Sequence, residues 1–394
     1  MNETPSSERI HIGIFGCVNA GKSSIINAIT ESKLAIVSDK RGTTTDPVIK
    51  SMEILPLGPV VLIDTPGYDD DSELGEERIK KVRQTLNRTD IAVLVLDGVI
   101  GMTEPDEILF DMIREKDIPY LIVYNKKDIG FKTPDISKND HIVFVSAKTG
   151  EGVETLKETL ARLIPETEKK RPLVSDLISA GDTIVLVCPI DESAPKGRII
   201  LPQQMMIRDI LDVGAAAVVT KETELSGILS GLRERPRMII TDSQVFKLVD
   251  EIVPADVPLT SFSILMARYK GYLEAAVSGI EAVEELKDGD TILMAEGCTH
   301  HRQCNDIGTV KIPDWLRKYT GKELIFETSS GRAFPEDLSK YSLIIHCGGC
   351  MITERDVRYR MKCAIDQGIP FTNYGITIAK MTGTLNRSME GIRL

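Results

Sequence analysis

Two groups of residues have the types and the spacing that chemistry requires, and they lie far apart in the chain. Residues 16–23 read GCVNAGKS, which is the spacing of a phosphate-binding loop. Residues 298–300 read CTH and residues 346–350 read HCGGC, so that thiols and imidazoles recur at ligand-like spacing. Thiolates bind soft metals and iron–sulfur clusters. A nucleotide switch joined to a thiolate site indicates a role in assembling a metal cofactor.

The phosphate-binding loop stands in the context that its chemistry needs. An apolar strand is predicted over residues 10–15 and a helix over residues 22–30. The loop between them would let backbone N–H groups wrap phosphates at a helix N-terminus. Lys22 would then reach the β- and γ-phosphates, and the Ser23 hydroxyl would ligate Mg²⁺.

Three further motifs predict that the nucleotide is GTP. Asp64-Thr-Pro-Gly67 ends an apolar strand, where a carboxylate can hold Mg²⁺ through water and an N–H can meet the γ-phosphate. Asp128, at the end of the NKKD motif, can accept two hydrogen bonds from guanine that adenine cannot supply. Residues 146–148 (SAK) cap the base pocket. The predicted nucleotide-binding residues are Asn19, Ala20, Gly21, Lys22, Ser23, Ser24, Asp64, Gly67, Asn125, Lys126, Asp128, Ser146, Ala147 and Lys148.

Residues 42–46 (GTTTD) are the natural first switch segment, in which one threonine closes over Mg²⁺ and the γ-phosphate. The alternative is a polar loop that binds no ligand. The first domain resembles the TrmE–Era branch of bacterial GTPases, in which this loop reads GTTRD. The resemblance implies that Thr44 is the Mg²⁺ ligand, while Thr45 stands where the family usually has arginine.

Tyr68 follows Gly67 at the point where Ras-like enzymes carry the glutamine that orients water. Asn19 matches the asparagine that relatives use to bind K⁺, which can stand in for an arginine finger. We therefore expect slow, K⁺-stimulated hydrolysis of GTP to GDP and phosphate, with Lys22, Asn19 and Thr44 as the catalytic groups. The alternative role for Asn19 is an amide that caps the loop.

The predicted cysteine site lies where strands end. Cys298 follows a strand predicted over residues 291–295, and Cys347 follows one over residues 343–346. Open α/β sheets place their ligands at the carboxyl ends of their strands. The neighbouring glycines at 297, 348 and 349 would let the backbone wrap a bulky group.

Three kinds of site are compatible with these residues. The first is a zinc site of three cysteines and a histidine, His300 or His346. The second is a thioredoxin-like redox pair of Cys347 and Cys350. The third is a [4Fe–4S] cluster on Cys298, Cys347 and Cys350 with one iron left for another ligand. The two histidines are expected either as that ligand or as residues around the site, and Asp306 is a further oxygen ligand candidate.

Composition limits the classes of function. The 394 residues carry a net charge of −11 and no basic stripe, which disfavours nucleic acid as the principal ligand. The chain shows no apolar signal region and no apolar run of membrane-spanning length, so we expect a cytoplasmic protein that does not bind a membrane.

The chain is too long for one core, and alternating strand and helix signals predict an α/β fold. We expect a doubly wound P-loop GTPase domain over residues 1–167, followed by two smaller α/β domains over residues 173–265 and 270–394. A charged, proline-bounded stretch, residues 165–172, is the predicted first linker. No fixed-period repeat is evident, although the second and third domains could be similar layers.

The spacing C-x-H, forty-five residues, then H-C-x-x-C resembles the signature of the HydF family of [FeFe]-hydrogenase maturation GTPases. The resemblance covers the whole chain. It implies a middle dimerisation domain that forms a homodimer, and a C-terminal domain whose [4Fe–4S] cluster has three cysteine ligands and one exchangeable position. It also implies a scaffold that receives a transient diiron precursor bearing CO and CN⁻ from radical-SAM maturases and delivers it to apo-[FeFe]-hydrogenase.

Two other classes of function remain to be distinguished from this one. A ribosome- or tRNA-associated GTPase is suggested by the first domain alone, and the acidic composition argues against it. A zinc- or redox-sensing regulatory GTPase would contain one zinc ion per chain in place of four irons and sulfide.

Overall fold

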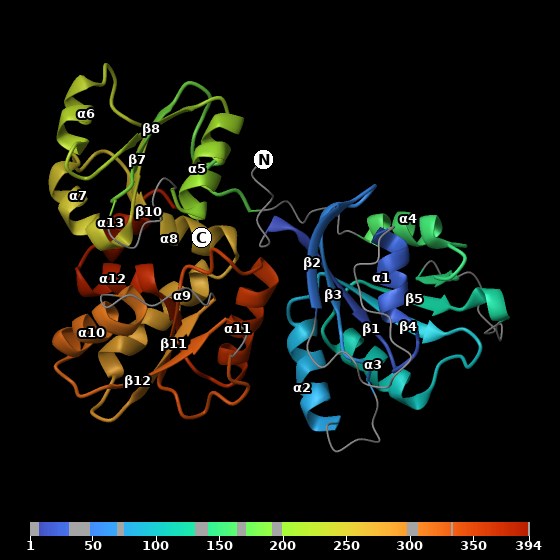
Figure 1. Ribbon diagram of the computed structural model, residues 1–394. Coiled ribbons are helices and arrows are strands. Elements are labelled where there is room, and N and C mark those ends of the chain that lie inside the picture. Colours follow the sequence, from blue (N-terminus) through green and yellow to red (C-terminus); the bar gives the residue numbers. More distant parts are fainter. Residues whose placement is uncertain are drawn as a thin grey trace. The chain divides into compact units, whose positions relative to one another are not determined.

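The computed structural model describes residues 8–30, 48–68, 75–130, 141–163, 171–190, 199–297, 306–331 and 334–392. The chain forms two compact units, Met1–Glu168 and Lys169–Leu394. Figure 1 labels their helices and strands.

The first unit is built on a six-stranded sheet in the order β2-β3-β1-β4-β5-β6, in which only β2 runs antiparallel to its neighbour. Its described strands are β1 (Ile10–Phe15), β2 (Val48–Ile54), β3 (Gly58–Asp64), β4 (Ile91–Asp97), β5 (Tyr120–Asn125) and β6 (Ile142–Phe144). Its described helices are α1 (Lys22–Thr30), α2 (Gly75–Leu86), α3 (Glu104–Glu115), the 3₁₀ turn η2 (Lys127–Ile129) and α4 (Val153–Leu163).

Helices cover both faces of this sheet. One core cluster joins α1 and α4 to the sheet, with Ile25 and Leu156 fully buried. A second cluster joins α2 and α3 to the other face, with Leu86 and Leu109 buried. The central strand β4 reads IAVLVLD and is buried on both sides, which explains its continuous apolar run. The predicted doubly wound P-loop domain is confirmed.

The second unit contains two four-stranded sheets, in the orders β10-β9-β7-β8 and β12-β11-β13-β14, and all their pairings are parallel. The elements around the first sheet are β7 (Thr183–Val187), α5 (Leu201–Asp212), β8 (Ala216–Thr220), α6 (Leu225–Gly231), β9 (Met238–Thr241), η3 (Ser243–Val245), α7 (Phe246–Ile252), β10 (Leu259–Ser261), α8 (Phe262–Tyr269), α9 (Leu273–Gly279) and η4 (Ile280–Glu285). Those around the second are β11 (Thr291–Glu296), the π-helical turn η5 (Ile307–Lys311), α10 (Ile312–Thr320), β12 (Ile325–Ser330), β13 (Leu343–His346), α11 (Glu354–Asp366), β14 (Phe371–Asn373), α12 (Tyr374–Met381) and α13 (Leu385–Met389).

The two sheets have the same topology. Counted along the chain, the first strand of each lies between the second and the third, and the fourth lies beyond the third. The sequence repeats as well, because residues 260–273 read TSFSILMARYKGYL and residues 372–385 read TNYGITIAKMTGTL. We name residues 181–280 the first copy and residues 289–392 the second copy.

The backbones of the two copies agree in detail. Gly271 has a φ of 72° and the equivalent Gly383 has 73°. The next residue closes the same turn in each copy, as Tyr272 N–H donates to Ala267 O at 3.0 Å and Thr384 N–H donates to Ala379 O at 2.9 Å. The two α/β layers are therefore tandem copies of one fold, as the sequence allowed. Insertions change the offset between the copies, which hides any fixed period.

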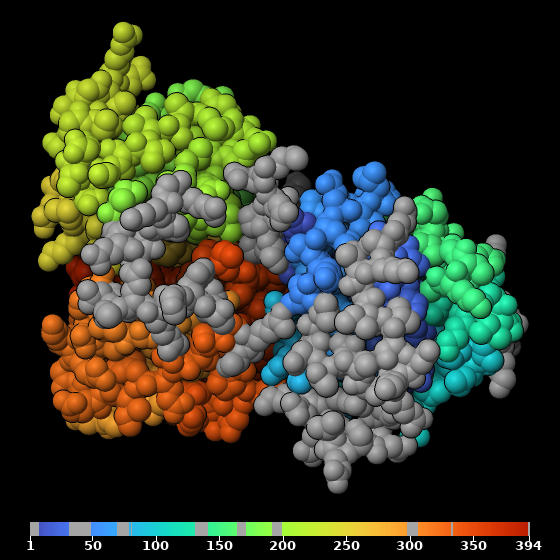
Figure 2. Space-filling model, viewed as in Figure 1, coloured from blue at the N-terminus to red at the C-terminus, as the bar shows by residue number. Residues whose placement is uncertain are grey.

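The two copies share one hydrophobic core. Buried residues from both sheets, including Ile184, Leu186, Leu293 and Ile344, belong to a single continuous cluster. The first copy, coloured green to yellow, and the second, orange to red, are packed together in both views (Figures 1 and 2). Among the residues described, no helix is both long enough and apolar enough to cross a membrane.

The sequence of residues 272–286 predicts one continuous helix, and the α-helix in the structure ends earlier. The α-helix α9 stops at Gly279 and continues as the 3₁₀ turn η4. The reason is close packing, since a Cβ at Gly279 would lie 2.2 Å from the carbonyl oxygen of Phe371 in β14. Only glycine allows the helix to approach the strand backbone this closely.

Candidate functional sites

The phosphate-binding loop holds its lysine inside the loop. The Lys22 ammonium donates to Gly16 O at 3.0 Å and to Cys17 O at 2.9 Å, and the residue is 7% exposed. Burial lowers the pKa of Lys22 to about 8, and the nearby Asp64 charge opposes this shift. A phosphate group is the natural partner for this buried cation.

The predicted Mg²⁺ residues meet beside the loop. The Ser23 hydroxyl donates to Asp64 Oδ2 at 2.8 Å. Asp64 Oδ1 is buried and has no hydrogen-bond partner within the described ranges. Burial raises the pKa of Asp64, while Ser23 and Lys22 act to lower it. An orphaned carboxylate oxygen beside a hydroxyl fits the oxygen ligands that hydrated Mg²⁺ takes.

The structure brings the phosphate-binding loop and the two predicted base-pocket segments together. Asn125 donates through Nδ2 to Ala20 O and accepts the Ala147 N–H on Oδ1, both at 3.1 Å. Ser146 Oγ donates to Asp128 Oδ1 at 2.8 Å. The phosphate loop also needs a glycine here, because a Cβ at Gly21 would lie 2.2 Å from Asn125 Nδ2.

Asp97 is a residue of this site that the sequence motifs do not include. It ends β4 and accepts a 2.6 Å hydrogen bond from the Lys126 ammonium. Burial acts to raise the pKa of Asp97, but the bond and charge of Lys126 together with the N–H groups of Val99 and Ile100 outweigh burial, so the pKa is lowered. Lys126 itself has a left-handed backbone, with φ at 67°. The feature of the sequence that could have identified Asp97 is its position as a polar residue at the carboxyl end of the buried strand β4.

Of the other predicted nucleotide-site residues, some are exposed, one packs against the phosphate-binding loop, and one lies outside the described residues. Asn19 is exposed and has a φ of 65°, and Lys148 is exposed. Gly67 packs against the loop, where a Cβ would lie 2.6 Å from the Val18 side chain. Thr44 and the whole predicted switch segment lie outside the described residues.

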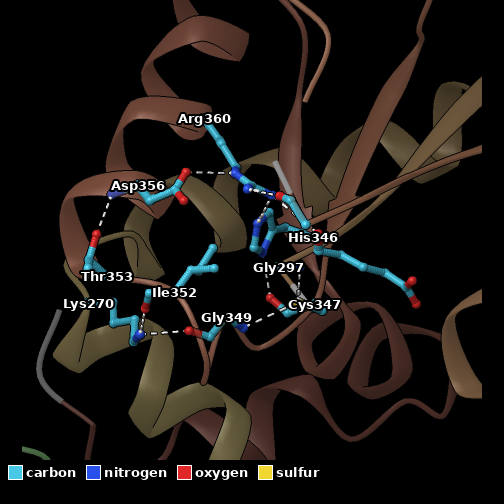
Figure 3. Close-up of polar contacts among 11 residues, drawn as sticks. Lys270, Gly297, His346, Cys347, Gly349, Ile352, Thr353, Asp356 and Arg360 are labelled. Carbon is cyan, nitrogen blue, oxygen red and sulfur yellow. Dashed lines mark hydrogen bonds and ion pairs between the residues drawn. The ribbon is translucent and has the colours of Figure 1, made fainter. Parts of the chain in front are cut away.

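The cysteine site lies at the topological switch point of the second copy. The chain leaves β11 for β12 on one side and leaves β13 for β14 on the other. Gly297 follows β11 and Cys347 follows β13, so both stand where open α/β sheets bind ligands. The Gly297 N–H donates to Cys347 Sγ at 3.1 Å, and the Gly349 N–H donates to the same sulfur at 3.4 Å (Figure 3).

Burial and hydrogen bonding act in opposite directions on Cys347. Burial raises the pKa of the Cys347 thiol, and the two N–H donors and the Arg360 charge oppose that rise. Burial also raises the pKa of Cys350, and the charge of Cys347 adds to it, while Lys270 lowers it. Burial thus favours the neutral thiols in the metal-free protein, while the backbone N–H groups and the two buried cations offset part of that cost for a thiolate ligand.

Lys270 and Arg360 are functional candidates that motif searching missed. Lys270 follows α8, is 2% exposed, and donates to Gly349 O at 2.6 Å and to Ile352 O (Figure 3). It thus holds the turn that carries both cysteines. Arg360 of α11 is equally buried; it donates to Gly331 O at 2.7 Å and to Asp356 Oδ1 at 3.0 Å.

His346 is enclosed by protein groups. Its Nδ1 donates to Cys347 O at 2.6 Å, and its Nε2 lies 3.4 Å from an Arg360 nitrogen that can donate to it. Complete burial lowers the pKa of His346 to about 3, and Arg360 and Lys270 add to this effect, so the ring is neutral. Both ring nitrogens have protein partners, which favours the alternative of a histidine that supports the site from behind.

The other predicted ligands are only partly placed. Cys298 and His300 lie outside the described residues. Asp306 Oδ2 accepts the Thr309 hydroxyl and the N–H groups of Gly308 and Thr309, at 2.9–3.1 Å, so this oxygen caps the turn η5. Within the described residues, no three His, Cys, Asp or Glu side chains gather into a metal-binding group. The two described thiols nevertheless fit a thiolate-bound group, given their N–H donors, their cations and the left-handed Gly349 between them.

Family models match most of the chain in three consecutive segments. Residues 11–126 match the model described as 50S ribosome-binding GTPase. Residues 173–271 match the hydrogen maturase F dimerization domain, and residues 274–391 match the hydrogen maturase F tetramerization domain.

Individual relatives match a smaller part. The tRNA modification GTPase MnmE of Nitrosomonas europaea is 34% identical over 158 residues, covering 39% of this chain and 35% of that protein. GTPase Der of Wolinella succinogenes is 33% identical over 186 residues, covering 44% of this chain and 39% of that protein. The chain thus spans little more than a third of the length of these curated relatives. A solved structure of Aquifex aeolicus Era bound to GDP and AlF₄⁻ is 22% identical with a TM-score of 0.36, covering 54% of this chain and 93% of that one.

The two hydrogen maturase F models together match more than half of the chain. They follow a GTPase domain whose nucleotide motifs converge in the structure. A GTPase domain fused to these two domains is the architecture of the hydrogenase maturation GTPases, and the chain belongs to the HydF family.

Proposed function

We propose that this chain is a GTP-hydrolysing scaffold that carries a diiron precursor during maturation of [FeFe]-hydrogenase. The observation that supports this most is the cradle around Cys347, where two backbone N–H groups meet one sulfur at the switch point of the second copy. That cradle lies inside the segment matched by a hydrogen maturase F model. The nucleotide site supplies the switch.

The nucleotide site would act through residues already in contact. Lys22 would exchange its two carbonyl partners for the β- and γ-phosphates, and Ser23 and Asp64 would hold Mg²⁺. Asp128 would accept hydrogen bonds from guanine. Hydrolysis to GDP would be slow and stimulated by K⁺ held at Asn19, because Tyr68 stands in the place of a water-orienting glutamine.

The cysteine site would hold a [4Fe–4S] cluster through Cys298, Cys347 and Cys350. Such a cluster supplies one iron whose fourth ligand can be exchanged, and this position would accept the substrate, a diiron complex bearing CO and CN⁻. The N–H donors and the cations around it would favour the thiolate form of the ligands, and Lys270 fixes the turn that carries two of them. We assign the exchangeable ligand to His300 or Asp306 ahead of His346, because both ring nitrogens of His346 already have partners.

Assembly with other proteins would follow from this role. The precursor would come from radical-SAM maturases, and apo-[FeFe]-hydrogenase would receive it, in the cytoplasm. A homodimer is supported by the family model of the first copy and by its exposed edge strand β8, where Val219 is 46% exposed. An unpaired parallel edge of this kind can extend a sheet across two chains.

Two readouts on one variant test this function. The Cys347→Ser chain, reconstituted anaerobically with iron and sulfide, should lose most of its cluster and its ability to activate apo-hydrogenase while still hydrolysing GTP. The control is Cys363→Ala on α11, which should behave as the wild type in every assay. If Cys347→Ser kept its iron, its sulfide and full activation, the scaffold proposal would be wrong. One zinc ion per wild-type chain, without sulfide, would favour the zinc-regulated class.

A further inference from the structure

The tandem copies provide an internal comparison for the residues around the cysteines. The turn that ends α8 carries Lys270 and Tyr272, and the equivalent turn after α12 carries Thr382 and Thr384. The backbones of the two turns are the same, as their glycine φ angles and closing hydrogen bonds show. Any group that one copy has and the other lacks is therefore not required by the turn itself.

Tyr272 carries such an extra group. In the second copy, the Thr384 hydroxyl lies 2.9 Å from the Thr382 hydroxyl and 3.5 Å from Ala379 O, so its polar atom is satisfied locally. The Tyr272 side chain is 1% exposed, and its hydroxyl has no hydrogen-bond partner in the described part of the chain. A buried hydroxyl left without a partner costs about 1–3 kcal/mol, so a small residue would serve the turn better.

Asn373 carries a second extra group. It ends β14 and caps α12, because its Oδ1 accepts the Ile376 N–H at 2.8 Å. The equivalent Ser261 caps α8 in the same way, with its Oγ accepting the Ile264 N–H at 3.3 Å. The cap uses one acceptor, so the amide nitrogen of Asn373 adds nothing to it. That nitrogen is buried and has no partner among the described residues.

Both orphaned donors lie beside the cysteine turn. Asn373 in β14 is paired in parallel register with His346 in β13, and His346 is the residue before Cys347. The Tyr272 ring packs edge-on against Phe371, two residues before Asn373, with centroids 6.1 Å apart. Burial is the main cause that raises the pKa of Tyr272, and charges on Cys347 and Cys350 add to the rise, so the phenol is within electrostatic reach of both sulfurs. The Asn373 amide is near enough to act on the same phenol, without making a hydrogen bond of normal geometry.

We propose that the Tyr272 hydroxyl and the Asn373 amide donate hydrogen bonds to sulfur atoms of the anionic metal–sulfur group held by the cysteines. They are positioning residues, which stay unsatisfied until that group is present and then stabilise its more negative oxidation state. An O–H or N–H donor that faces an anionic sulfur raises the reduction potential of a cluster, because the reduced form gains more from the bond. This inference rests on the proposed cluster-binding function.

Tyr272→Phe removes the phenol O–H, and Asn373→Ser removes the amide N–H₂ and leaves a shorter hydroxyl in its place. Phenylalanine keeps the ring that packs on Phe371, and serine is the cap found in the first copy. Tyr341→Phe is the matched control, because it removes a phenol bonded to Glu327 near the opposite, amino end of β13. Full-length proteins would be compared in two assays: thermal unfolding of the metal-free chain, and a redox titration of the reconstituted cluster followed by EPR.

For Tyr272→Phe, the stability of the metal-free chain should stay the same or rise, while the reduction potential of the cluster should fall. Metal-free Tyr272→Phe should be at least as stable as the wild type, because it loses an unsatisfied hydroxyl. Its cluster should need a more negative potential for reduction, with the ratio of reduced to oxidised cluster falling about tenfold at a fixed potential, or about 59 mV for one electron. Asn373→Ser should shift the potential in the same direction, and Tyr341→Phe should leave it unchanged.

Different failures have different meanings. If the wild type holds a cluster and the clusters of both variants have the same reduction potential as the wild-type cluster, the donors do not face the cluster. That result would overturn this inference and leave the proposed function standing. The same holds if metal-free Tyr272→Phe is clearly destabilised, since its hydroxyl would then have a protein partner. If the wild type takes up no iron and sulfide, the proposed function itself fails and this inference fails with it.

Discussion

At the scale of single residues, Lys22 has a proton affinity that depends strongly on its surroundings. Burial lowers its pKa from 10.5 to about 8 in the nucleotide-free protein. The unfolded chain therefore binds more protons than the folded chain between about pH 8 and 10.5, so this group makes folding more favourable as pH rises through that window. A bound phosphate would restore the charged form and reverse the shift.

GTP binding should consequently take up protons above pH 8. Calorimetric titrations at pH 8.5 in buffers of different ionisation enthalpy should give different observed enthalpies, corresponding to uptake of a fraction of one proton. Repeating them at pH 6.5, where Lys22 is charged in both states, should remove the dependence on buffer. Identical enthalpies in all buffers at pH 8.5 would show that Lys22 is already protonated in the empty loop.

Asp128 should decide the choice of base. Asp128→Asn replaces an acceptor by an amide that can turn a donor toward guanine N1–H, and a lost hydrogen bond to a charged group is worth about 1.5–3 kcal/mol. We expect GTP affinity to fall at least tenfold, measured with a fluorescent analogue, while xanthosine triphosphate binds better than it does to the wild type. Asp111→Asn on the exposed face of α3 is the control. Unchanged GTP affinity in Asp128→Asn would remove Asp128 from the base pocket.

The residue scale is also where sequence reasoning reaches furthest. Spacing alone identifies Lys22, Ser23 and Asp128, because phosphate and guanine recognition tolerates few arrangements. It does not identify Asp97, Lys270 or Arg360, because each acts through a contact between segments far apart in the chain. His346 was open to several roles until its two ring partners were known.

At the scale of elements, α8 connects the start of the second unit to the cysteine turn. Arg268, near its end, makes a bidentate ion pair with Asp176 and donates to Pro172 O, so it holds both the last residue of the predicted linker and the segment that follows it. Two residues later, Lys270 binds the carbonyls of Gly349 and Ile352. One short helix thus fixes both the entry of the chain and the turn that carries Cys347 and Cys350.

Replacing Lys270 should loosen that turn. Lys270→Met keeps most of the aliphatic stem but leaves two carbonyls without this donor, and we expect about 2–3 kcal/mol of destabilisation. Iron uptake on reconstitution should fall as well, because the two sulfurs are less well positioned. Lys340→Met, which removes an exposed pair with Glu327, should leave the stability close to that of the wild type. Normal stability and iron uptake in Lys270→Met would show that the turn is held by other contacts.

Element boundaries show the limit of periodicity. Apolar runs predict β7, β9 and β13 because these strands are buried on both faces. The end of α9 could not be predicted, since it depends on the approach of Gly279 to the backbone of β14, ninety residues away in sequence. The short strands β10 and β14 have too few residues to form a pattern of their own.

At the scale of the whole molecule, the shared core predicts that the two copies unfold together. The chain has one tryptophan, Trp315, which lies on α10 in the second copy and packs against that core. Ile184→Ala in β7 of the first copy should lower the stability reported by Trp315 fluorescence by about 2–5 kcal/mol. Val93→Ala in the GTPase unit should leave the Trp315 transition where it is. If Ile184→Ala left that transition unchanged, the copies would be separate folding units.

The duplication is the largest feature that the sequence alone did not reveal. Five of the fourteen aligned residues in segments 260–273 and 372–385 are identical, which is visible only when the two segments are placed side by side. Strand order and equivalent turns make the relationship plain. The duplication also isolates the groups specific to the cysteine site, since the other copy keeps the same backbone without them.

The central claim is that a GTPase of this architecture holds a cluster with an open iron, and low-temperature EPR tests it most directly. Anaerobically reconstituted, dithionite-reduced wild-type protein should show a fast-relaxing S = 1/2 signal of a [4Fe–4S]⁺ cluster. Added cyanide or imidazole should shift that signal, because one iron has an exchangeable ligand, and Cys347→Ser should lose it. A silent sample that contains stoichiometric zinc, or a cluster signal that neither ligand perturbs, would contradict the account.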